Sequence, residues 1–209
     1  LLAGLVAARR AFLVCGGTGS GKTTLLGAML GLVPATDRIV IVEDSRELRP
    51  DHPHCVRLEA RPANAEGAGS VTLADLVRQA LRMRPDRIVV GEVRGGELAD
   101  LLRALNTGHE GGCGTVHANS AADVPARLEA LGALGGLTSA ALHAQLGPAL
   151  QVLVQVRRLP NGLRWVEELA LVSPRDDGRC EVVPALGFSP GRPAVAGPGL
   201  AELRRLATP

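Results

Sequence analysis

The fold is decided by the segment Gly16-Gly17-Thr18-Gly19-Ser20-Gly21-Lys22-Thr23, which matches the phosphate-binding pattern GxxxxGK[ST] in full. It follows a short apolar run, Ala11 to Cys15, and leads into a helix-like segment, Lys22 to Leu32. Glycines let successive backbone N–H groups converge without interference from Cβ atoms, and the positive end of the following helix points at the same place. The order of strand, turn and helix therefore predicts a site for the polyphosphate of a nucleotide.

Two side chains complete the predicted nucleotide site. Lys22 is the only lysine among 23 basic residues, and all the others are arginine. Its ammonium is expected to reach the β- and γ-phosphate oxygens of ATP, while the Thr23 hydroxyl is expected to bind Mg²⁺. The residues predicted to bind the cofactor are Gly16, Gly17, Thr18, Gly19, Ser20, Gly21, Lys22, Thr23 and Thr24.

The composition excludes several classes of protein. With 209 residues, 46% of them apolar and 21% charged, the chain fits a globular domain and neither a disordered segment nor a membrane bundle. The 23 basic and 21 acidic residues nearly balance, and Phe12, Trp165 and Phe188 are the only aromatic residues. We therefore expect no direct binding of nucleic acid.

Strand-like and helix-like segments alternate over residues 1–172, which is typical of a parallel sheet with crossover helices. The segments Val152 to Arg157 and Leu163 to Val172 flank the turn signal Asn161-Gly162 and predict an antiparallel hairpin. This part of the chain is thus expected to be an α/β domain with a mainly parallel central sheet, helices on both faces and an antiparallel C-terminal hairpin. Further strands are expected near 38–43, 56–59, 87–91 and 114–117, and helices near 73–83, 97–105, 121–134 and 139–150.

The two ends of the sequence read differently from its middle. Pro and Gly accumulate over residues 173–209, which predicts a peripheral strand and a loose tail. Leu1 to Arg10 reads as a helix whose start is missing. We therefore expect that an N-terminal domain precedes it.

Carboxylates follow two of the predicted strands. Glu43 and Asp44 end one, and Glu92 ends another. Because ligands of a parallel sheet bind outside the carboxyl ends of its strands, these acids are candidate partners of the P-loop, although a helix N-cap or a solvated turn is the alternative for each. Glu92 is the better general base, since a glutamate on a stiff strand can polarise a water for in-line attack on the γ-phosphate, and Gly91 leaves space for it.

Two histidines flank a Gly-rich approach to the last predicted parallel strand. They are His109 and His117. A histidine at a strand end near a P-loop can detect the γ-phosphate through a hydrogen bond, and capping of the next helix is the alternative role. His117, at the strand end, is the stronger candidate.

Together, four motifs in this order resemble the ATPases of type II and type IV secretion and of type IV pili, over about residues 1–172. Arg82 to Asp86 and Glu43 to Leu48 look most like the tight-adherence (Flp) pilus assembly and conjugal-transfer branch, and the tetracysteine zinc motif of the type II branch is absent from the sequence. The motifs are Walker A (Gly16 to Thr23), a paired-acid box (Ile41 to Asp44), a Walker B with glycine before glutamate (Val90 to Arg94) and a histidine box (Gly108 to Asn119).

The resemblance implies a RecA-like ATPase domain in a homo-hexamer that powers pilus assembly, secretion or conjugal transfer. The ring would lie at the cytoplasmic face of the inner membrane, bound there through a platform protein. The resemblance assigns phosphate and Mg²⁺ to Lys22 and Thr23, catalysis to Glu92 and γ-phosphate sensing to His117. Glu43 is placed near metal and water, so that Glu43 or Glu92 would reach the Mg²⁺ through water.

Other functions stay open. A RecA-like DNA-dependent ATPase or DNA-translocating motor would want basic or aromatic loops, a small-molecule kinase would need a longer lid than residues 61–70, and a catalytically dead scaffold would not need Lys22, Thr23 and Glu92. A hexameric ATPase also needs a cation at its subunit boundary. The candidates are Arg46, Arg57, Arg61, Arg82 and Arg84.

Overall fold

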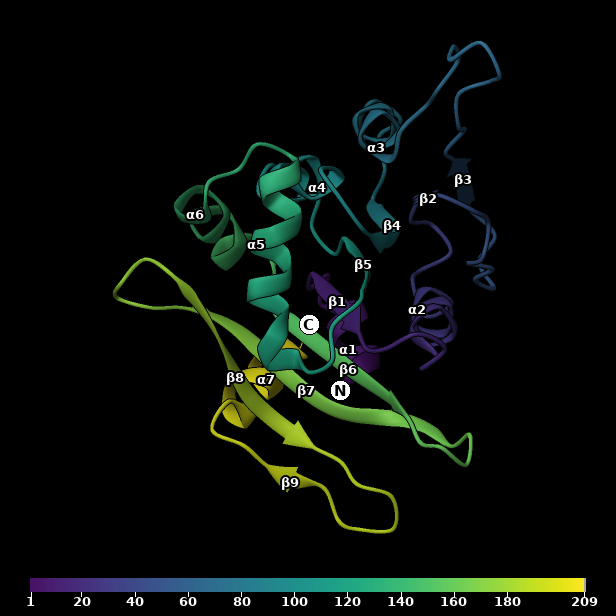
Figure 1. Ribbon diagram of the computed structural model, residues 1–209. Coiled ribbons are helices and arrows are strands. Elements are labelled where there is room, and N and C mark those ends of the chain that lie inside the picture. The colour runs from purple at the N-terminus through teal and green to yellow at the C-terminus, as the bar shows by residue number, and fades with distance from the viewer. Residues whose placement is uncertain (209) are drawn as a thin grey trace.

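A mixed sheet runs through the centre of the molecule (Figure 1). The computed structural model describes residues 1–208, and within them nine strands are ordered β3-β2-β4-β5-β1-β6-β7-β8-β9. The parallel strands are β1 (Phe12–Cys15), β2 (Ile39–Glu43), β3 (Cys55–Glu59), β4 (Arg87–Val93), β5 (Cys113–Val116) and β6 (Val152–Arg158). The antiparallel strands are β7 (Arg164–Pro174), β8 (Cys180–Gly187) and β9 (Val195–Ala196).

The central strands are apolar because both faces of the sheet are covered. Every residue of β1 and β2 is buried, as expected for parallel strands between two helical layers. The side chains of β1 alternate between two cores. Leu13 and Cys15 belong to one core, and Phe12 and Val14 to the other.

Helices cover each face of the sheet (Figure 1). One face packs against α3 (Leu73–Arg82), α4 (Glu97–Leu105), α5 (Val124–Leu134) and α6 (Ser139–Ala149), and a 3₁₀ turn, Ala121–Asp123, leads into α5. The other face packs against α1 (Leu2–Ala7), α2 (Lys22–Leu30) and α7 (Leu200–Leu206). Among the described residues, no helix combines the length and the apolar character needed to cross a bilayer.

Local sequence explains where these helices begin. At α3, Thr72 Oγ1 accepts the backbone N–H of Asp75, and the Asp75 carboxylate accepts the backbone N–H of Thr72. This reciprocal cap satisfies two N–H groups that have no partner inside the helix. At α2, the cap is Gly21 in the left-handed conformation, which ends the phosphate loop.

The predicted fold class is confirmed. The sheet is mainly parallel, helices lie on both faces, and β6 and β7 form the antiparallel hairpin that Asn161-Gly162 indicates. The strands and helices predicted up to Val172 are all found, with small shifts at their ends.

The segment after Val172 holds more regular structure than its Pro and Gly content predicts. β8 and β9 extend the sheet, and α7 buries Leu203 completely in the core that it shares with α1. A Cβ on Gly4 would lie 2.1 Å from the carbonyl oxygen of Ala207, so the two ends of the described chain touch (Figure 1). This segment is ordered, contrary to the expectation of a loose tail, because its apolar residues pack into the core.

Candidate active site

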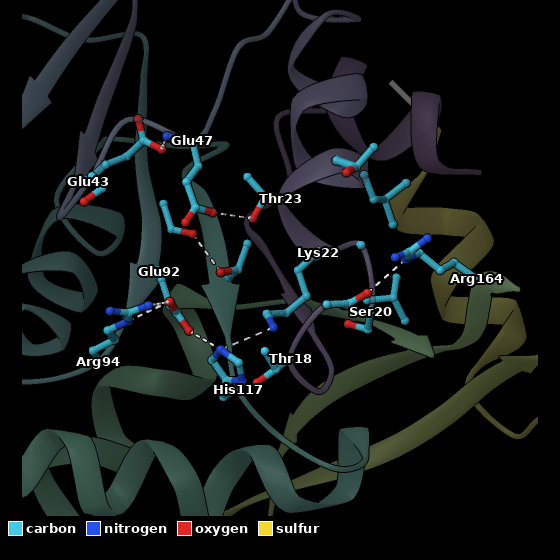
Figure 2. A pocket seen from close by; sticks show the side chains of 18 of the residues that line it. Thr18, Ser20, Lys22, Thr23, Glu43, Glu47, Glu92, Arg94, His117 and Arg164 are labelled. Carbon is cyan, nitrogen blue, oxygen red and sulfur yellow. Dashed lines mark hydrogen bonds and ion pairs between the residues drawn. The ribbon is translucent and has the colours of Figure 1, made fainter. Parts of the chain in front are cut away.

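A pocket of about 880 Å³ opens at the carboxyl ends of β1, β2, β4 and β5, where parallel sheets bind ligands. Figure 2 shows Lys22 in the middle, Glu92 and His117 on one side of it and Arg164 on the other. Gly16 and Gly17 contribute to the loop but not to the lining. The predicted site residues that line the pocket are Thr18, Gly19, Ser20, Gly21, Lys22, Thr23, Thr24, Glu43, Glu92 and His117.

Glycines shape the phosphate loop between β1 and α2. Gly16 and Gly21 have φ angles of 154° and 98°, which other residues rarely adopt. A Cβ on Gly16 would also lie 2.4 Å from the carbonyl oxygen of Val156, so only glycine fits beside β6. The first residues of α2 line the pocket, which places the positive end of this helix at the site.

Lys22 is buried against neutral partners. The residue is only 7% exposed, and its Nζ donates to the carbonyl oxygens of Gly16 and Gly17, each at 3.0 Å. Burial lowers the pKa of Lys22, and the negative charge of Glu92 opposes this shift. Two carbonyl groups are modest partners for a buried ammonium, so a phosphate anion beside it would be strongly favoured.

Glu92 lies at the centre of the polar side of the pocket (Figure 2). Its Oε1 is 2.5 Å from His117 Nε2, and its Oε2 accepts a hydrogen bond of 2.6 Å from Arg94 Nε. Arg94 also reaches Asp44, with 3.6 Å between Nη1 and Oδ2. Two neighbours therefore fix the orientation of the Glu92 carboxylate.

His117 connects Glu92 to the phosphate loop. Burial lowers the pKa of His117 below its ordinary value of 6.5, and the Lys22 ammonium lowers it further, while Glu92 raises it. The imidazole is thus neutral near pH 7. Its Nε2 lies 3.5 Å from Lys22 Nζ, in a hydrogen bond with that ammonium, and also close to Glu92 Oε1, which has no hydrogen-bond partner among the described residues. His109, the other histidine of this box, does not line the pocket.

Glu43 lines the pocket and binds the backbone through one of its two carboxylate oxygens. Glu43 is 3% exposed, and its Oε1 accepts the backbone N–H groups of Glu47 at 3.0 Å and Leu48 at 2.8 Å. Gly91, expected to leave space for Glu92, leaves it for Glu43, because a Cβ on Gly91 would lie 2.6 Å from Glu43 Cγ. Glu43 therefore holds the turn after β2.

The carboxylate that reaches Thr23 belongs to Glu47. Its Oε2 accepts a hydrogen bond of 3.4 Å from Thr23 Oγ1 (Figure 2). In the sequence, Glu47 lies outside the paired-acid box, within the segment Glu43 to Leu48 that resembles the pilus and conjugation branch, and no role follows for it from that resemblance. The signal was its place in the turn directly after a strand that ends beside the P-loop.

The β6–β7 hairpin forms the other side of the pocket. Arg164 Nε donates to the carbonyl oxygen of Gly19 at 2.9 Å, and Val156, Trp165 and Val166 add a mostly apolar wall. No motif in the sequence marks these residues. The pairing of β6 with β1 brings them to the loop.

The arginines proposed for a neighbouring subunit do not line the pocket of their own chain. Arg46 forms an ion pair of 3.2 Å with Glu59, and Arg61 donates to the Gly69 carbonyl at 2.8 Å. Arg57 is the least exposed of the group and donates to the Leu48 carbonyl at 2.9 Å, whereas Arg82 and Arg84 are exposed near the end of α3.

The pocket fits a nucleoside triphosphate and Mg²⁺. A glycine loop, a helix start and a buried ammonium suit a polyphosphate. The Thr23 hydroxyl and the Glu47 carboxylate are oxygen ligands of the kind that Mg²⁺ prefers. Glu43 Oε2, on the same wall, is buried without a hydrogen-bond partner among the described residues.

Comparison with known proteins assigns the family. Residues 1–161 match the family model described as "Type II/IV secretion system protein". The chain belongs to this family. The resemblance predicted from the four motifs is thereby confirmed, and the fold is that of the RecA-like secretion ATPases.

Relatives of this secretion ATPase family come from conjugation, secretion and pilus systems. A putative conjugal transfer protein of Mycobacterium tuberculosis is 65% identical over 183 residues, which cover 88% of this chain and 52% of the relative. The VirB11 ATPase of the Brucella suis type IV secretion system, solved with sulphate, is 34% identical with a TM-score of 0.71, over 80% of this chain and 50% of that one. The pilus retraction motor PilT, solved with ADP, is 29% identical with a TM-score of 0.59, and the match covers 86% of this chain and 48% of PilT. The chain thus spans about half the length of these proteins.

Proposed function

We propose that this chain is the ATP-hydrolysing domain of a Mg²⁺-dependent motor that powers pilus assembly, macromolecular secretion or conjugal transfer. The observation that carries the proposal is the convergence of Lys22, Glu92 and His117 in one pocket at the phosphate loop. When bound, Mg²⁺ and ATP would supply the γ-phosphoryl group and the metal charge that balances its oxygens.

The phosphate loop and α2 bind the polyphosphate. Lys22 exchanges its two carbonyl partners for phosphate oxygens, which satisfies the buried ammonium with a full negative charge. Thr23, at the start of α2, and Glu47, in the turn after β2, would hold the metal through their side-chain oxygens. Glu43 acts through the turn that it holds and is a positioning residue.

Glu92 orients the attacking water and accepts its proton. Arg94 donates to one carboxylate oxygen and His117 lies against the other, so the orientation of the carboxylate is fixed. A fixed carboxylate can orient the attacking water as well as accept its proton.

A complete site requires a neighbouring subunit. Of the two arginines that line the pocket, Arg94 pairs with Glu92 and Asp44, and Arg164 binds the Gly19 carbonyl on the side of Lys22 opposite Glu92. The cation opposite the leaving phosphate then comes from the next subunit of a homo-hexamer. The ring works at the cytoplasmic face of the inner membrane, where a platform protein of the pilus or secretion system holds it. The relatives named for conjugal transfer, type IV secretion and pilus retraction support this assembly.

The proposal is tested by separating binding from hydrolysis. In the longer protein that carries this domain, Glu92→Gln should keep ATP affinity while phosphate release falls by about 10² or more. Lys22→Ala should instead lose most affinity for a fluorescent ATP analogue. Glu181→Gln is the matched control, because Glu181 is an exposed strand residue of β8 outside the pocket. Unchanged nucleotide affinity in Lys22→Ala would remove the assignment.

A further inference from the structure

One half of the pocket has no part in the proposed reaction. Glu92, His117 and Glu47 gather on the β2–β4–β5 side of Lys22, whereas Arg164 lies on the opposite side (Figure 2). The pocket continues on that opposite side, where the β6–β7 hairpin forms its wall. If the terminal phosphate lies beside Glu92, the nucleoside must extend towards this hairpin.

We propose that Trp165 and Val166 form the wall that binds the purine ring of the nucleotide. The inference rests on the proposed function, since it takes the position of the terminal phosphate from it. Trp165 is the only tryptophan of the chain and the only aromatic residue that lines the pocket. Its indole N–H donates to the Phe188 carbonyl at 3.4 Å, and the half-buried ring lines both this pocket and the adjacent apolar groove, so it offers apolar surface to a base.

The hairpin is tied directly to the phosphate loop. Arg164 bonds the Gly19 carbonyl, and a Cβ on Gly21 would lie 3.3 Å from Arg164 Cδ. Arg158, the register partner of Arg164 on β6, comes equally close to Gly19, with 3.3 Å from Nη1 to a Cβ placed there. The base wall and the phosphate loop are thus held in a fixed relation, which lets one ligand contact both.

This wall predicts weak discrimination between purines. Val156, Val166 and Leu25 are apolar, the indole N–H already has a partner, and the Arg164 guanidinium can only donate, so this wall offers the base edge no matched donor and acceptor pair. Stacking is tolerant of base identity, and apolar pockets reject close analogues poorly. ATP and GTP should therefore bind with affinities within about tenfold of each other.

The single tryptophan provides a direct probe. Intrinsic fluorescence of the 209-residue chain is titrated with Mg²⁺–ATP, Mg²⁺–GTP and inorganic tripolyphosphate, and tripolyphosphate binding is measured by competition against a fluorescent ATP analogue. We expect both nucleotides to change the Trp165 emission, and tripolyphosphate to compete without changing it. The same emission change with all three ligands, or none with ATP at saturation, overturns the proposal.

Substitutions separate the base wall from the phosphate loop. Trp165→Ala should weaken ATP binding about tenfold and leave tripolyphosphate binding unchanged, while Trp165→Phe stays within about threefold of wild type. Phe188→Leu is the matched control, since Phe188 lines the adjacent apolar groove and not this pocket. Equal loss of ATP and tripolyphosphate binding in Trp165→Ala would show a structural role and contradict the base wall. A wild-type chain that binds neither ligand would instead refute the proposed function itself.

Discussion

The two sides of the phosphate loop are built in opposite ways. On the β2–β4–β5 side, Glu92, His117 and Arg94 form a connected polar network, supplied by the ends of separate strands. On the β6–β7 side, one hairpin supplies an apolar wall, and its Arg164 is bound to a loop carbonyl. The first side can move a proton and balance charge, whereas the second can fix only position and shape. Chemistry and ligand placement are therefore divided between two parts of the fold.

The largest expected effect on ATP turnover concerns a cation opposite the leaving phosphate. Among the described residues that line the pocket, Arg94 is paired with Glu92 and Asp44 and Arg164 lies on the side opposite Glu92, so removal of an arginine donated by the neighbouring subunit should lower ATP turnover by about 10³ or more. Arg46 and Arg61 follow β2 and β3 at the edge of the sheet where the pocket opens, and both are exposed, so they are tested first. Each Arg→Ala variant of the longer protein is assayed for phosphate release.

Mixing variants distinguishes a shared site from a damaged one. When Glu92→Gln chains are mixed with Arg→Ala chains, some interfaces regain a complete set of residues, and activity should return. Arg82 and Arg84 lie before β4, at the opposite edge of the sheet, and serve as comparison positions with Arg57. If no mixture regains activity and turnover is proportional to protein concentration throughout, each subunit works alone.

A smaller effect is expected from the packing that supports the polar side. Gly91→Ala places a Cβ 2.6 Å from Glu43 Cγ, and overpacking of this kind costs about 1–3 kcal/mol. Displacing Glu43 also releases the turn that carries Glu47, so we expect ATP turnover to fall about tenfold. Denaturant unfolding and phosphate release are measured together.

The matched control for that substitution is Gly27→Ala. Gly27 lies inside α2, and a Cβ there would meet only Leu48 Cδ2 at 3.9 Å, an ordinary contact. Alanine favours a helix over glycine by about 1 kcal/mol, so this variant should be at least as stable as wild type. If Gly91→Ala unfolds at the same denaturant concentration as Gly27→Ala, the contact with Glu43 does not limit packing.

The polar side of the pocket contains both residues that local sequence places and residues that it does not. Lys22 and Thr23 begin the helix that the glycine loop joins to β1, and Glu92 lies at the carboxyl end of β4, so local sequence is enough to place them at the carboxyl edge of a parallel sheet. Glu47 reaches Thr23 only because Glu43 turns inward, and that depends on the space at Gly91, on another strand. No pattern within one segment contains this information.

The position of the β6–β7 hairpin beside the pocket depends on strand order and register, which involve residues far apart in the sequence. Trp165 reaches the pocket because β6 pairs with β1, and because the register of β6 and β7 shifts between Gln155 and Val156. Strand order and an irregular register change which side chains face the loop. The Asn161-Gly162 signal predicted the hairpin but could not place it beside the phosphate loop.

The smallest expected effect tests the charges of the polar side directly. The pKa of His117 lies below 6.5 because of burial first and Lys22 second, with Glu92 acting in the opposite direction. Glu92→Gln removes the attraction and should lower the pKa of His117 further, while Lys22→Ala removes a repulsion and should raise it towards 6.5. The imidazole resonances of His117, followed by NMR across the pH range in the 209-residue chain, measure both shifts.

The lowered pKa of His117 also makes the free energy of unfolding depend on pH. As pH falls, the unfolded chain binds the proton before the folded chain does. The stabilising contribution of His117 is therefore complete above pH 6.5 and decreases as pH falls through the folded pKa. If neither variant shifts the pKa of His117, burial alone sets its titration, and the polar side differs from the hairpin side in geometry but not in charge coupling.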